Sequence, residues 1–341
     1  MTKRVKIGIN GFGRIGRSIA RILAEKDTGL ELTLVNDLTD EGTLAHLLEF
    51  DSVHGKANGA VSCKDGVLSL AGNPGVSARI SAKSRPEEIP WSAHGVELVL
   101  ECTGLFTDRS KAASHISGSV KRVLISAPSK DADVTIVRGV NHEKLDLSKH
   151  TVVSCGSCTT NCLAPIAAVI HKEFGIVRGS MTTIHSYTND QRILDLPHKD
   201  LRRARAAALS MIPTSTGAAK AIGLVIPELA GKLDGLAIRV PTPNVSLLDL
   251  VCEVSRNTSR DELIAVLKSA ASRSSVLDVT ERELVSVDFN GCSKSAVVDL
   301  ESSSVIGERM VKVLAWYDNE TGFSTRMVEL AAQMVGVSGN V

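Results

Sequence analysis

The pattern of apolar and polar residues predicts strands that alternate with helices in the first half of the chain. Apolar runs predict strands at residues 5–10, 32–37, 97–102, 122–126 and 135–139. Apolar residues recur at helical spacing after residue 14 and again over residues 108–116. Such alternation implies right-handed crossovers and a mostly parallel sheet. We therefore expect an α/β fold of the Rossmann type, a doubly wound parallel sheet, over residues 1–156.

The second half predicts a different architecture, a catalytic α+β domain with a mixed or antiparallel sheet over residues 157–319. Helical patterns follow residue 158 and cover 260–271, and a last one follows residue 320. Strands are predicted at residues 179–185, 246–254, 285–290, 295–300 and 310–317. Consecutive strands with few helices indicate that sheet type. Residues 186–205 read as a polar loop of about 20 residues, a length that is usually functional.

Composition narrows the class of protein. The 341 residues suffice for two domains, and 43% of them are hydrophobic while only 3% are aromatic. Because 39 basic residues balance 38 acidic ones, no global field favours nucleic acid or an anionic membrane. The chain starts without an apolar leader and carries no apolar run of membrane-spanning length, so we expect a soluble cytoplasmic protein. Seven cysteines, an odd number, do not indicate a disulfide framework.

A glycine motif marks the first candidate site. Gly11-Phe12-Gly13-Arg14-Ile15-Gly16 stands between the first strand and the first helix, the context that a dinucleotide fingerprint requires. The glycines allow a tight turn that approaches a pyrophosphate, and the helix N-terminus meets its charge. The alternative is a glycine turn without a ligand. The candidate cofactor-binding residues here are Asn10, Gly11, Gly13, Arg14, Ile15 and Gly16.

An acid at the end of the next strand supports that reading. Asp37 follows the glycines by about 20 residues, the spacing of a ribose-binding carboxylate. It would repel a 2′-phosphate, which favours NAD over NADP. A helix cap ahead of Glu41 is the structural alternative for Asp37. Loops at the carboxyl ends of later strands should line the same cleft, which adds Ser126 to the candidates.

Three cysteines in one turn mark the second candidate site. Cys155, Cys158 and Cys162 lie between an apolar run and a helical pattern, so Cys158 falls at a helix start. The positive end of a helix lowers the pKa of a thiol and favours a thiolate nucleophile. Buried apolar cysteines are one alternative, whereas a zinc site lacks a fourth ligand at suitable spacing, so we expect no metal. Neighbouring hydroxyls of Ser157, Thr159 and Thr160 offer hydrogen-bond donors.

Candidate partners of the cysteine come from the following strands. Among nine histidines, His185 ends a predicted strand at the mouth of the polar loop, where an imidazole could act as the base. His171, on the helix itself, is the comparison. Arginines follow at positions 202, 203, 205 and 239. They could form a solvated charged face, or they could bind phosphate, because guanidinium forks match phosphate oxygens.

Several strings carry a family resemblance. Ser157-Cys158-Thr159-Thr160-Asn161-Cys162-Leu163-Ala164-Pro165 resembles the active-site signature of glyceraldehyde-3-phosphate dehydrogenases. Further matches stand at residues 9–17, 215–220, 239–244 and 316–320, so the resemblance covers nearly the whole chain. The chain departs from the family pattern at Cys155-Gly156, where Asn-Ala is usual, which places a second thiol near the nucleophile.

The resemblance assigns roles to individual residues. It implies that Cys158 is the nucleophile and His185 the base, that Arg85 lies near the adenine, and that Asn319 lies near the nicotinamide amide. It implies a substrate-phosphate site at Thr188 and Arg239. It also implies an inorganic-phosphate site at Ser157, Thr160, Thr216, Gly217 and either Arg202 or Arg205. Leu196-Pro197 resembles the NAD-using members.

The resemblance implies a phosphorylating, NAD-dependent oxidation of glyceraldehyde 3-phosphate through a cysteine thioester. It also implies a homotetramer and a C-terminal helix, at about 320–341, that packs on the nucleotide domain. The nearest alternative is the sister enzyme that acts on erythrose 4-phosphate. The string Thr214-Ser215-Thr216-Gly217 resembles the triose-phosphate enzymes more closely and disfavours this alternative. A distant rival is an RNA-binding protein, which the balanced charge disfavours.

Overall fold

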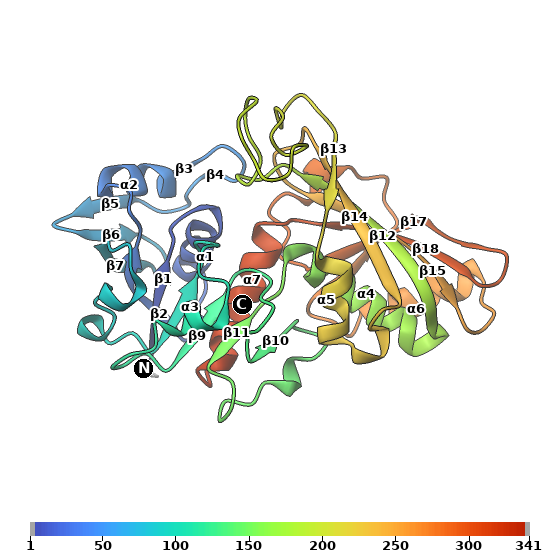
Figure 1. The fold of residues 1–341 in the computed structure, drawn as a ribbon, viewed down its shortest axis with the longest axis horizontal. Coiled ribbons are helices and arrows are strands. Elements are labelled where there is room, and N and C mark those ends of the chain that lie inside the picture. The colour runs from blue at the N-terminus through green and yellow to red at the C-terminus, as the bar shows by residue number, and fades with distance from the viewer. Residues whose placement is uncertain (1–3, 338–341) are drawn as a thin grey trace. The chain divides into compact units, whose positions relative to one another are not determined.

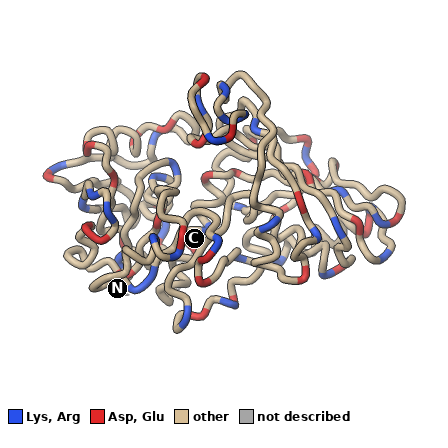
Figure 2. The backbone as a smooth tube through the Cα atoms, in the orientation of Figure 1, with Lys and Arg blue, Asp and Glu red and all other residues tan. Residues whose placement is uncertain are grey.

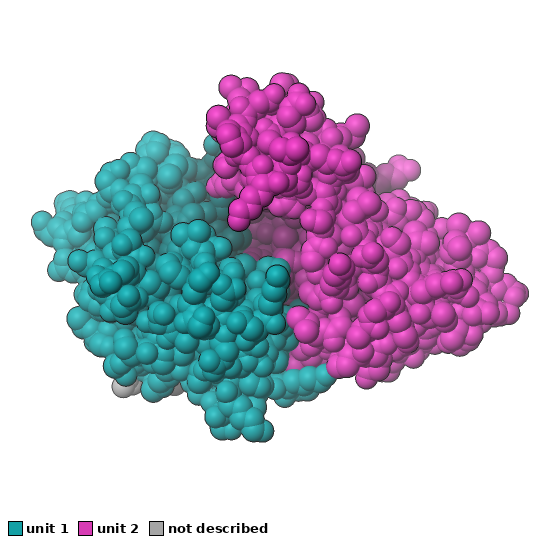
Figure 3. Space-filling view, in the orientation of Figure 1, with its two compact units in different colours: residues 1–138, 142–156, 324–341 teal, residues 139–141, 157–323 magenta. Residues whose placement is uncertain are grey.

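The computed structural model describes residues 4–337 and divides into two compact units. Unit 1 holds the chain up to Arg138, the segment His142–Gly156 and the chain from Ser324 onward. Unit 2 holds Gly139–Asn141 and Ser157–Phe323. Figure 3 colours the two units separately. Each unit has its own large sheet, so each candidate site can be described within one unit.

Unit 1 is built on a nine-stranded sheet with the order β10-β11-β9-β8-β1-β2-β7-β6-β5 (Figure 1). The pairs from β10 to β7 are all parallel, whereas β6 and β5 join as antiparallel strands at one edge. The strands are β1 (Val5–Asn10), β2 (Leu30–Asn36), β5 (Val61–Lys64), β6 (Val67–Leu70), β7 (Val76–Ser81), β8 (Leu98–Glu101), β9 (Arg122–Ile125), β10 (Val134–Thr135) and β11 (Val152–Ser154). A separate pair joins β3 (Phe50–Asp51) to β4 (Gly55–Lys56). The predicted doubly wound α/β fold is confirmed.

Helices connect the parallel strands of unit 1. α1 (Arg14–Glu25) starts directly after the glycine turn and buries the face that carries Ile19 and Leu23. α2 (Glu41–Glu49) is capped by Asp40, whose carboxylate accepts from the backbone N–H of Thr43. α3 (Arg109–Ala113) is shorter than the predicted 108–116. α7 (Thr321–Met334) starts in unit 2 and continues in unit 1. Of the expected helix over 320–341, residues 338–341 lie outside the described part.

Unit 2 is built on a seven-stranded mixed sheet with the order β13-β14-β12-β15-β18-β17-β16. Its strands are β12 (Ile176–Ser186), β13 (Ile212–Ser215), β14 (Leu233–Val240), β15 (Ser246–Val254), β16 (Leu277–Thr280), β17 (Ala296–Ile306) and β18 (Met310–Tyr317). β12 is parallel to β14 and antiparallel to β15. The helices of unit 2 pack against strands of this sheet, and α5 (Ala218–Val225) and α6 (Arg260–Ala271) also pack against α4 (Cys158–Phe174). The expected mixed sheet is confirmed.

Two predicted strands of the chain are wrong or too long. Residues 285–290 do not form a strand, because Ser286–Phe289 is a 3₁₀ helix. The Asp288 carboxylate accepts from the backbone N–H of Val285, which closes this turn, and Phe289 stacks on Trp316. The strand expected over 135–139 shrinks to the two residues of β10. Apolar content alone did not separate these segments from true strands.

The surface of the two units carries no single dominant charge. Figure 2 shows basic and acidic positions interspersed along the backbone, in keeping with the balanced composition. Within residues 4–337, no helix combines the length and the apolar character needed to cross a membrane. In the same range, no group of three or more His, Cys, Asp or Glu residues is arranged to hold a metal ion.

A close contact in β1 gives a test of the packing in unit 1. A side-chain carbon on Gly8 would lie 2.3 Å from the Trp91 ring, which is itself buried. We expect Gly8→Ala to lower the free energy of unfolding by about 1 to 3 kcal/mol, since the crowded core must shift. Gly42→Ala, on the exposed face of α2, should instead raise stability by up to about 1 kcal/mol. Urea unfolding of both variants measures the contrast, and equal stabilities would contradict this packing.

Candidate functional site

A cavity in unit 1 lies where the sequence predicts the cofactor cleft. Its volume is about 300 Å³, and it lies at the carboxyl ends of β1, β2 and β8. That is the edge at which parallel α/β sheets bind their ligands. The lining residues are Asn10, Gly11, Gly13, Asn36, Asp37, Leu38, Lys83, Ser84, Cys102, Thr103, Leu105 and Phe106. Four of the residues singled out in the sequence therefore line it: Asn10, Gly11, Gly13 and Asp37.

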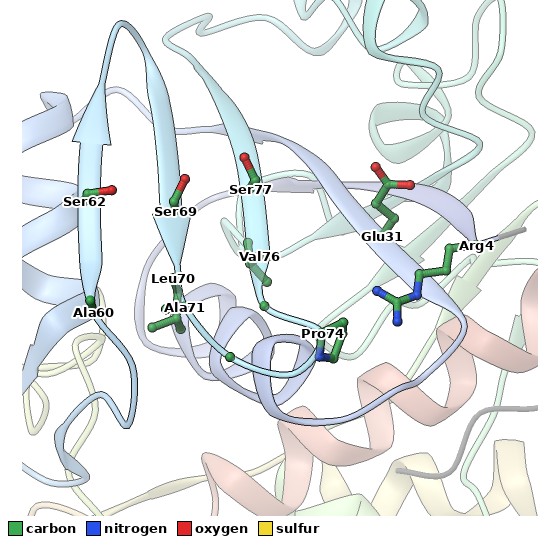
Figure 4. Close-up of a pocket in the computed structure, with 12 residues that line it drawn as sticks. Arg4, Glu31, Ala60, Ser62, Ser69, Leu70, Ala71, Pro74, Val76 and Ser77 are labelled. Carbon is green, nitrogen blue, oxygen red and sulfur yellow. The ribbon is translucent and has the colours of Figure 1, made fainter. Parts of the chain in front are cut away.

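A larger cavity in unit 1, of about 630 Å³, lies at a different place in the fold (Figure 4). Arg4, just before β1, and Glu31, at the start of β2, line it, together with residues of the β5–β7 strands. These positions mark the amino-terminal ends of the parallel strands, opposite the edge where the glycine turn lies. Volume alone therefore does not identify the cofactor site.

The glycine turn fits a dinucleotide. Gly11 has φ +90°, and a Cβ there would lie 2.7 Å from the backbone nitrogen of Thr103. A Cβ on Gly16 would lie 2.4 Å from the Gly11 carbonyl oxygen, so only glycine lets α1 start this close to the turn. Gly13 faces open space, since nothing lies within 4 Å of the position its Cβ would take. This leaves room for a phosphate at the start of α1.

Asp37 is held as an anion at the edge of this cavity. Its carboxylate accepts from the backbone N–H of Phe12 at 2.7 Å and of Thr39 at 3.0 Å. Burial opposes ionisation, but these hydrogen bonds outweigh it and lower the pKa of Asp37 below its usual value. The helix-cap alternative is not realised, because Asp40 caps α2. A fixed anion at this point suits ribose hydroxyls and disfavours a 2′-phosphate.

Other cofactor candidates have different surroundings. Arg14 pairs with Asp51 at 2.5 Å. Burial opposes ionisation of Asp51, but backbone hydrogen bonds from His54 and Val53, together with Arg14, lower its pKa to about 2. Ile15 lies beside Arg14 in the first turn of α1. Arg85 is mostly exposed and pairs with Glu88. Its neighbour Ser84, which the sequence did not single out, lines the cavity instead.

Two further cofactor candidates lie at strand ends. Ser126 follows β9, and its backbone N–H donates to the carbonyl of Glu101. Asn319 lies in unit 2, where its side-chain oxygen accepts from the hydroxyls of Ser186 at 2.8 Å and Ser246 at 3.0 Å. Because both serines occupy that oxygen, the amide nitrogen of Asn319 keeps its hydrogens for another acceptor.

Cys158 is the first residue of α4, as the sequence predicts. Ser157 caps the helix, and its hydroxyl oxygen accepts from the backbone N–H of Thr160 at 3.0 Å. The hydroxyls of Ser157 and Thr160 also lie 2.8 Å apart. Thr159 turns the other way, with its hydroxyl 2.9 Å from that of the buried Tyr317. The cap therefore fixes the turn that presents the thiol.

His185 lies within reach of the thiol. Its Nε2 is 3.5 Å from the Cys158 sulfur, and its Nδ1 is 2.6 Å from the carbonyl oxygen of Ser186. Nδ1 also lies 3.0 Å from Nη1 of Arg239, which can only donate, whereas the carbonyl oxygen can only accept. The carbonyl contact is the shorter one, and it favours a proton on Nδ1 in the neutral ring. Nε2 then presents a lone pair to the thiol. This arrangement suits a base that takes the thiol proton.

Strand register brings Arg239 to the same place. In the parallel pair of β12 and β14, His185 stands directly beside Arg239. The Arg239 guanidinium donates to the Ser186 carbonyl at 3.1 Å and lies 3.4 Å from the hydroxyl of Thr188. A single carbonyl thus receives both the imidazole N–H and the guanidinium. The predicted pair of Thr188 and Arg239 is brought together with His185.

The charges of this site follow from its burial. Burial raises the pKa of the Cys158 thiol, and this outweighs the opposite effects of Arg239 and of hydrogen bonds from Thr159. Burial also lowers the pKa of His185 to about 3, helped by the nearby charges of Arg239 and Arg203. The thiol pKa is therefore shifted upward by burial, opposite to the lowering that the sequence predicts for a cysteine at a helix start. The imidazole lies where it could accept the proton of the Cys158 thiol.

Arg203 is a residue whose position the sequence did not resolve. Its side chain is 19% exposed, whereas that of Arg205 is 66% exposed and pairs with Asp195. Arg203 donates to the Thr214 hydroxyl at 2.9 Å and to the Ser215 carbonyl at 3.0 Å. Arg202 is exposed and reaches only the Pro213 carbonyl, at 3.3 Å. Among the three arginines, Arg203 is the one whose charge acts on His185 and Arg239.

The last phosphate candidates begin another helix. Gly217 is the N-cap of α5, and Thr216 accepts from the backbone N–H of Ala218 at 3.2 Å. The space beside Gly217 is open, since nothing lies within 4 Å of the position its Cβ would take. Thr216 and Gly217 directly follow β13, which carries the partner residues of Arg203.

The fold and the two sites define a class. The dinucleotide fold carries an acid placed for ribose, and a half-buried cysteine faces a histidine beside an arginine. Together they describe an NAD-dependent dehydrogenase with a cysteine nucleophile. Residues 157–319 match the glyceraldehyde 3-phosphate dehydrogenase C-terminal domain, and residues 5–109 match the NAD-binding domain of the same enzyme. The chain belongs to the glyceraldehyde 3-phosphate dehydrogenase family.

Named relatives cover almost the full length. Glyceraldehyde-3-phosphate dehydrogenase 1 of Bacillus cereus is 56% identical over 331 residues, which are 96% of this chain and 98% of the relative. The glyceraldehyde-3-phosphate dehydrogenase of Geobacillus stearothermophilus is 56% identical over 96% of this chain and 97% of its own. That of Streptomyces coelicolor is 50% identical with the same coverage. The cofactor of this chain is NAD, as its NAD-binding domain implies.

The contact between thiol and imidazole predicts how thiol reactivity depends on pH. In a His185→Gln variant the thiol loses its proton acceptor, and burial then keeps its pKa raised. We expect alkylation of Cys158 by iodoacetamide at pH 7 to slow at least tenfold, and its rate to rise about tenfold per pH unit up to pH 9, as the thiolate forms. A His171→Gln variant is the control. Unchanged alkylation in His185→Gln would contradict the role of the imidazole.

Proposed function

We propose that the chain oxidises D-glyceraldehyde 3-phosphate to 1,3-bisphosphoglycerate with NAD and inorganic phosphate. The observation that carries this proposal is the Cys158 sulfur 3.5 Å from Nε2 of His185, with Arg239 beside the same imidazole. A nucleophile, a base and a fixed cation at one buried point suit the oxidation of a phosphorylated aldehyde.

The proposed reaction starts at the thiol. Cys158 adds to the aldehyde carbon, and its proton passes through His185 to the new hydroxyl, which gives a hemithioacetal. His185 then removes the hydroxyl proton as the carbon loses a hydride, and a thioester remains. NAD, when bound, accepts that hydride. Inorganic phosphate attacks the thioester, which releases the acyl phosphate and returns the thiol.

The phosphate groups need separate cations. We propose that Arg239 and Thr188 hold the substrate phosphate, because both lie beside His185. Inorganic phosphate would meet Ser157, Thr160, Thr216, Gly217 and an arginine, with Thr159 as support through Tyr317. Burial and charge favour Arg203 for that arginine over Arg202 and Arg205, the two residues expected from the sequence.

The cofactor contacts are proposed from the unit 1 cavity. Asn10, Gly11, Gly13, Arg14, Ile15 and Gly16 would hold the pyrophosphate region, and Asp37 the adenosine ribose. Arg85, Ser126 and Asn319 remain proposals that follow the family pattern. We also propose that residues 1–156, with the C-terminal helix, form the NAD-binding domain and residues 157–319 the catalytic domain.

The assembly is proposed to be a homotetramer. The loop from β12 to β13 exposes large apolar side chains on the surface of unit 2, which are Ile193, Leu194, Leu196, Leu201, Leu209 and Met211. Contiguous exposed apolar side chains are typical of a protein interface. A cytoplasmic location is likewise proposed, and the seven cysteines, none of which forms a disulfide, suit a reducing compartment.

The reaction is tested by NADH formation with the triose phosphate and NAD, with and without inorganic phosphate. We expect turnover to depend on phosphate, because it cleaves the thioester. Erythrose 4-phosphate should be the poorer substrate. Cys158→Ser should lose at least about a thousandfold in turnover, since its hydroxyl is a far weaker nucleophile, and still bind NAD. Preference for the tetrose, or turnover that ignores phosphate, would contradict the proposed anion sites.

The assembly is tested by sedimentation at micromolar concentration. A homotetramer should show four times the 36.1 kDa mass of the chain. Replacement of Ile193 and Leu201 by glutamate should shift the protein to smaller species, because charges then face the proposed interface. A wild-type protein that sediments as a monomer would overturn the proposal.

A further inference from the structure

A buried carboxylate lies below the floor of the cofactor cavity. Glu101, the last residue of β8, is 1% exposed, and it does not line the cavity itself. Its Oε1 accepts from the backbone N–H of Thr103 at 2.8 Å and from the Thr103 hydroxyl. Its Oε2 accepts from Nδ2 of Asn10 at 2.6 Å and from Nε2 of His115 at 3.1 Å. Four donors thus surround one anion.

On the other side of Glu101, the indole of Trp91 fixes the tautomer of His115, which contacts the carboxylate. His115 is completely buried, and the N–H of Trp91 lies 3.2 Å from its Nδ1. An indole N–H can only donate, so Nδ1 of His115 accepts and Nε2 carries the proton. His115 is therefore neutral and donates to Glu101. No cation balances the charge of Glu101 in this contact.

On the side of Glu101 that faces the cavity, the hydrogen bonds also run from donors toward the carboxylate. Because Nδ2 of Asn10 donates to Glu101, its Oδ1 is left to accept from Nδ2 of Asn36, at 2.8 Å. Asn36 is held at two points, since it donates to the carbonyl of Lys83 and accepts from the N–H of Lys83, both at 2.9 Å. Each amide thus has one orientation.

Thr103 is oriented in the same way. Its hydroxyl must donate to Glu101, because a carboxylate only accepts, so its lone pairs face the N–H of Leu105, at 3.0 Å. Asn10, Asn36, Lys83, Thr103 and Leu105 all line the cavity. Glu101 therefore holds the middle of the chain of hydrogen bonds from Leu105 to Lys83, through Thr103 and Asn10, while the backbone of Lys83 holds its end at Asn36.

We propose that Glu101 is a positioning residue for NAD binding, whose buried carboxylate holds the Asn10 amide and the Thr103 hydroxyl in place in the cavity floor. Burying an unpaired carboxylate is costly, and a neutral apolar residue would pack at lower cost. What the carboxylate adds is acceptor capacity on both oxygens, which no neutral side chain of the same shape supplies. The proposal rests on NAD binding alone, not on the reaction in unit 2.

The isosteric variant Glu101→Gln tests this directly. Its amide nitrogen must face either the two donors from Thr103 or the donors from Asn10 and His115, so one side of the floor loses its acceptor. We expect NAD to bind about tenfold more weakly, which corresponds to about 1.4 kcal/mol. Turnover at saturating NAD should stay within about twofold of wild type, because the variant weakens NAD binding equally in the ground state and in the transition state. Isothermal titration with NAD measures the affinity without the aldehyde.

Glu97→Gln is the matched control. Glu97 stands just before the other end of β8 and pairs with Lys121 at the surface, where a lost ion pair costs little, so we expect NAD affinity within about twofold of wild type. A folded Glu101→Gln protein with wild-type NAD affinity would overturn the proposal.

If Glu101→Gln does not fold, the NAD affinity of a Thr103→Val variant tests the proposal instead. It removes only the hydroxyl that donates to Glu101 and accepts from Leu105, so we expect NAD to bind about threefold more weakly because one hydrogen-bonding group is lost. Unchanged NAD affinity in Thr103→Val would then overturn the proposal. Alkylation of Cys158 with iodoacetamide shows in each variant that unit 2 is intact, which separates loss of the cavity floor from loss of the whole protein.

Discussion

The parallel pairing of β12 with β14 is the constraint on which the chemistry of unit 2 depends. It places Arg239 beside His185, although 54 residues separate them, and it directs both side chains to the Ser186 carbonyl. The contact of that oxygen with Nδ1, shorter than the contact of Nδ1 with Arg239, favours the imidazole tautomer whose unprotonated Nε2 faces Cys158. A slip of one residue in this register would turn Arg239 to the opposite face of the sheet, away from the imidazole. The sheet therefore sets the protonation geometry of the active cysteine, and α4 only delivers the thiol.

Burial decides how that geometry is used. His185 is 4% exposed, and exclusion of water disfavours unpaired charge, which raises the pKa of the Cys158 thiol and lowers the pKa of His185. Arg239 and Arg203 both bring positive charge to the site, but Arg203 is already paired with Asp190. An incoming phosphate would supply an anion for Arg239, and it would thereby ease the formation of an imidazolium ion that Arg239 opposes. Phosphate bound at Arg239 would thus also ease proton transfer to His185.

The sequence predicts those parts of the molecule that depend on neighbours in the chain. The glycine turn, Asp37 after its strand and Cys158 at a helix start are local patterns, and the structure has each where the pattern predicts it. Arg203 was not separated from Arg202 and Arg205, because their burial depends on Asp190 and Thr214, which come from other segments. The strand expected at 285–290 failed for the same reason, since contacts with Trp316 and a local turn outweigh its apolar content. The direction of the Cys158 pKa shift was missed because burial cannot be read from spacing.

Both units orient polar side chains in the same way, by placing donors around an atom that can only accept hydrogen bonds. In unit 2 it is the Ser186 carbonyl, between His185 and Arg239; in unit 1 it is the Glu101 carboxylate, between Asn10, Thr103 and His115. A hydroxyl or an amide in either place could reverse its role, and its neighbours would then have two arrangements of similar energy. An atom that cannot donate leaves one arrangement. Groups that must meet a ligand with the correct hydrogen-bond polarity are thus oriented before the ligand binds, and the cost is carried by buried atoms that never touch it.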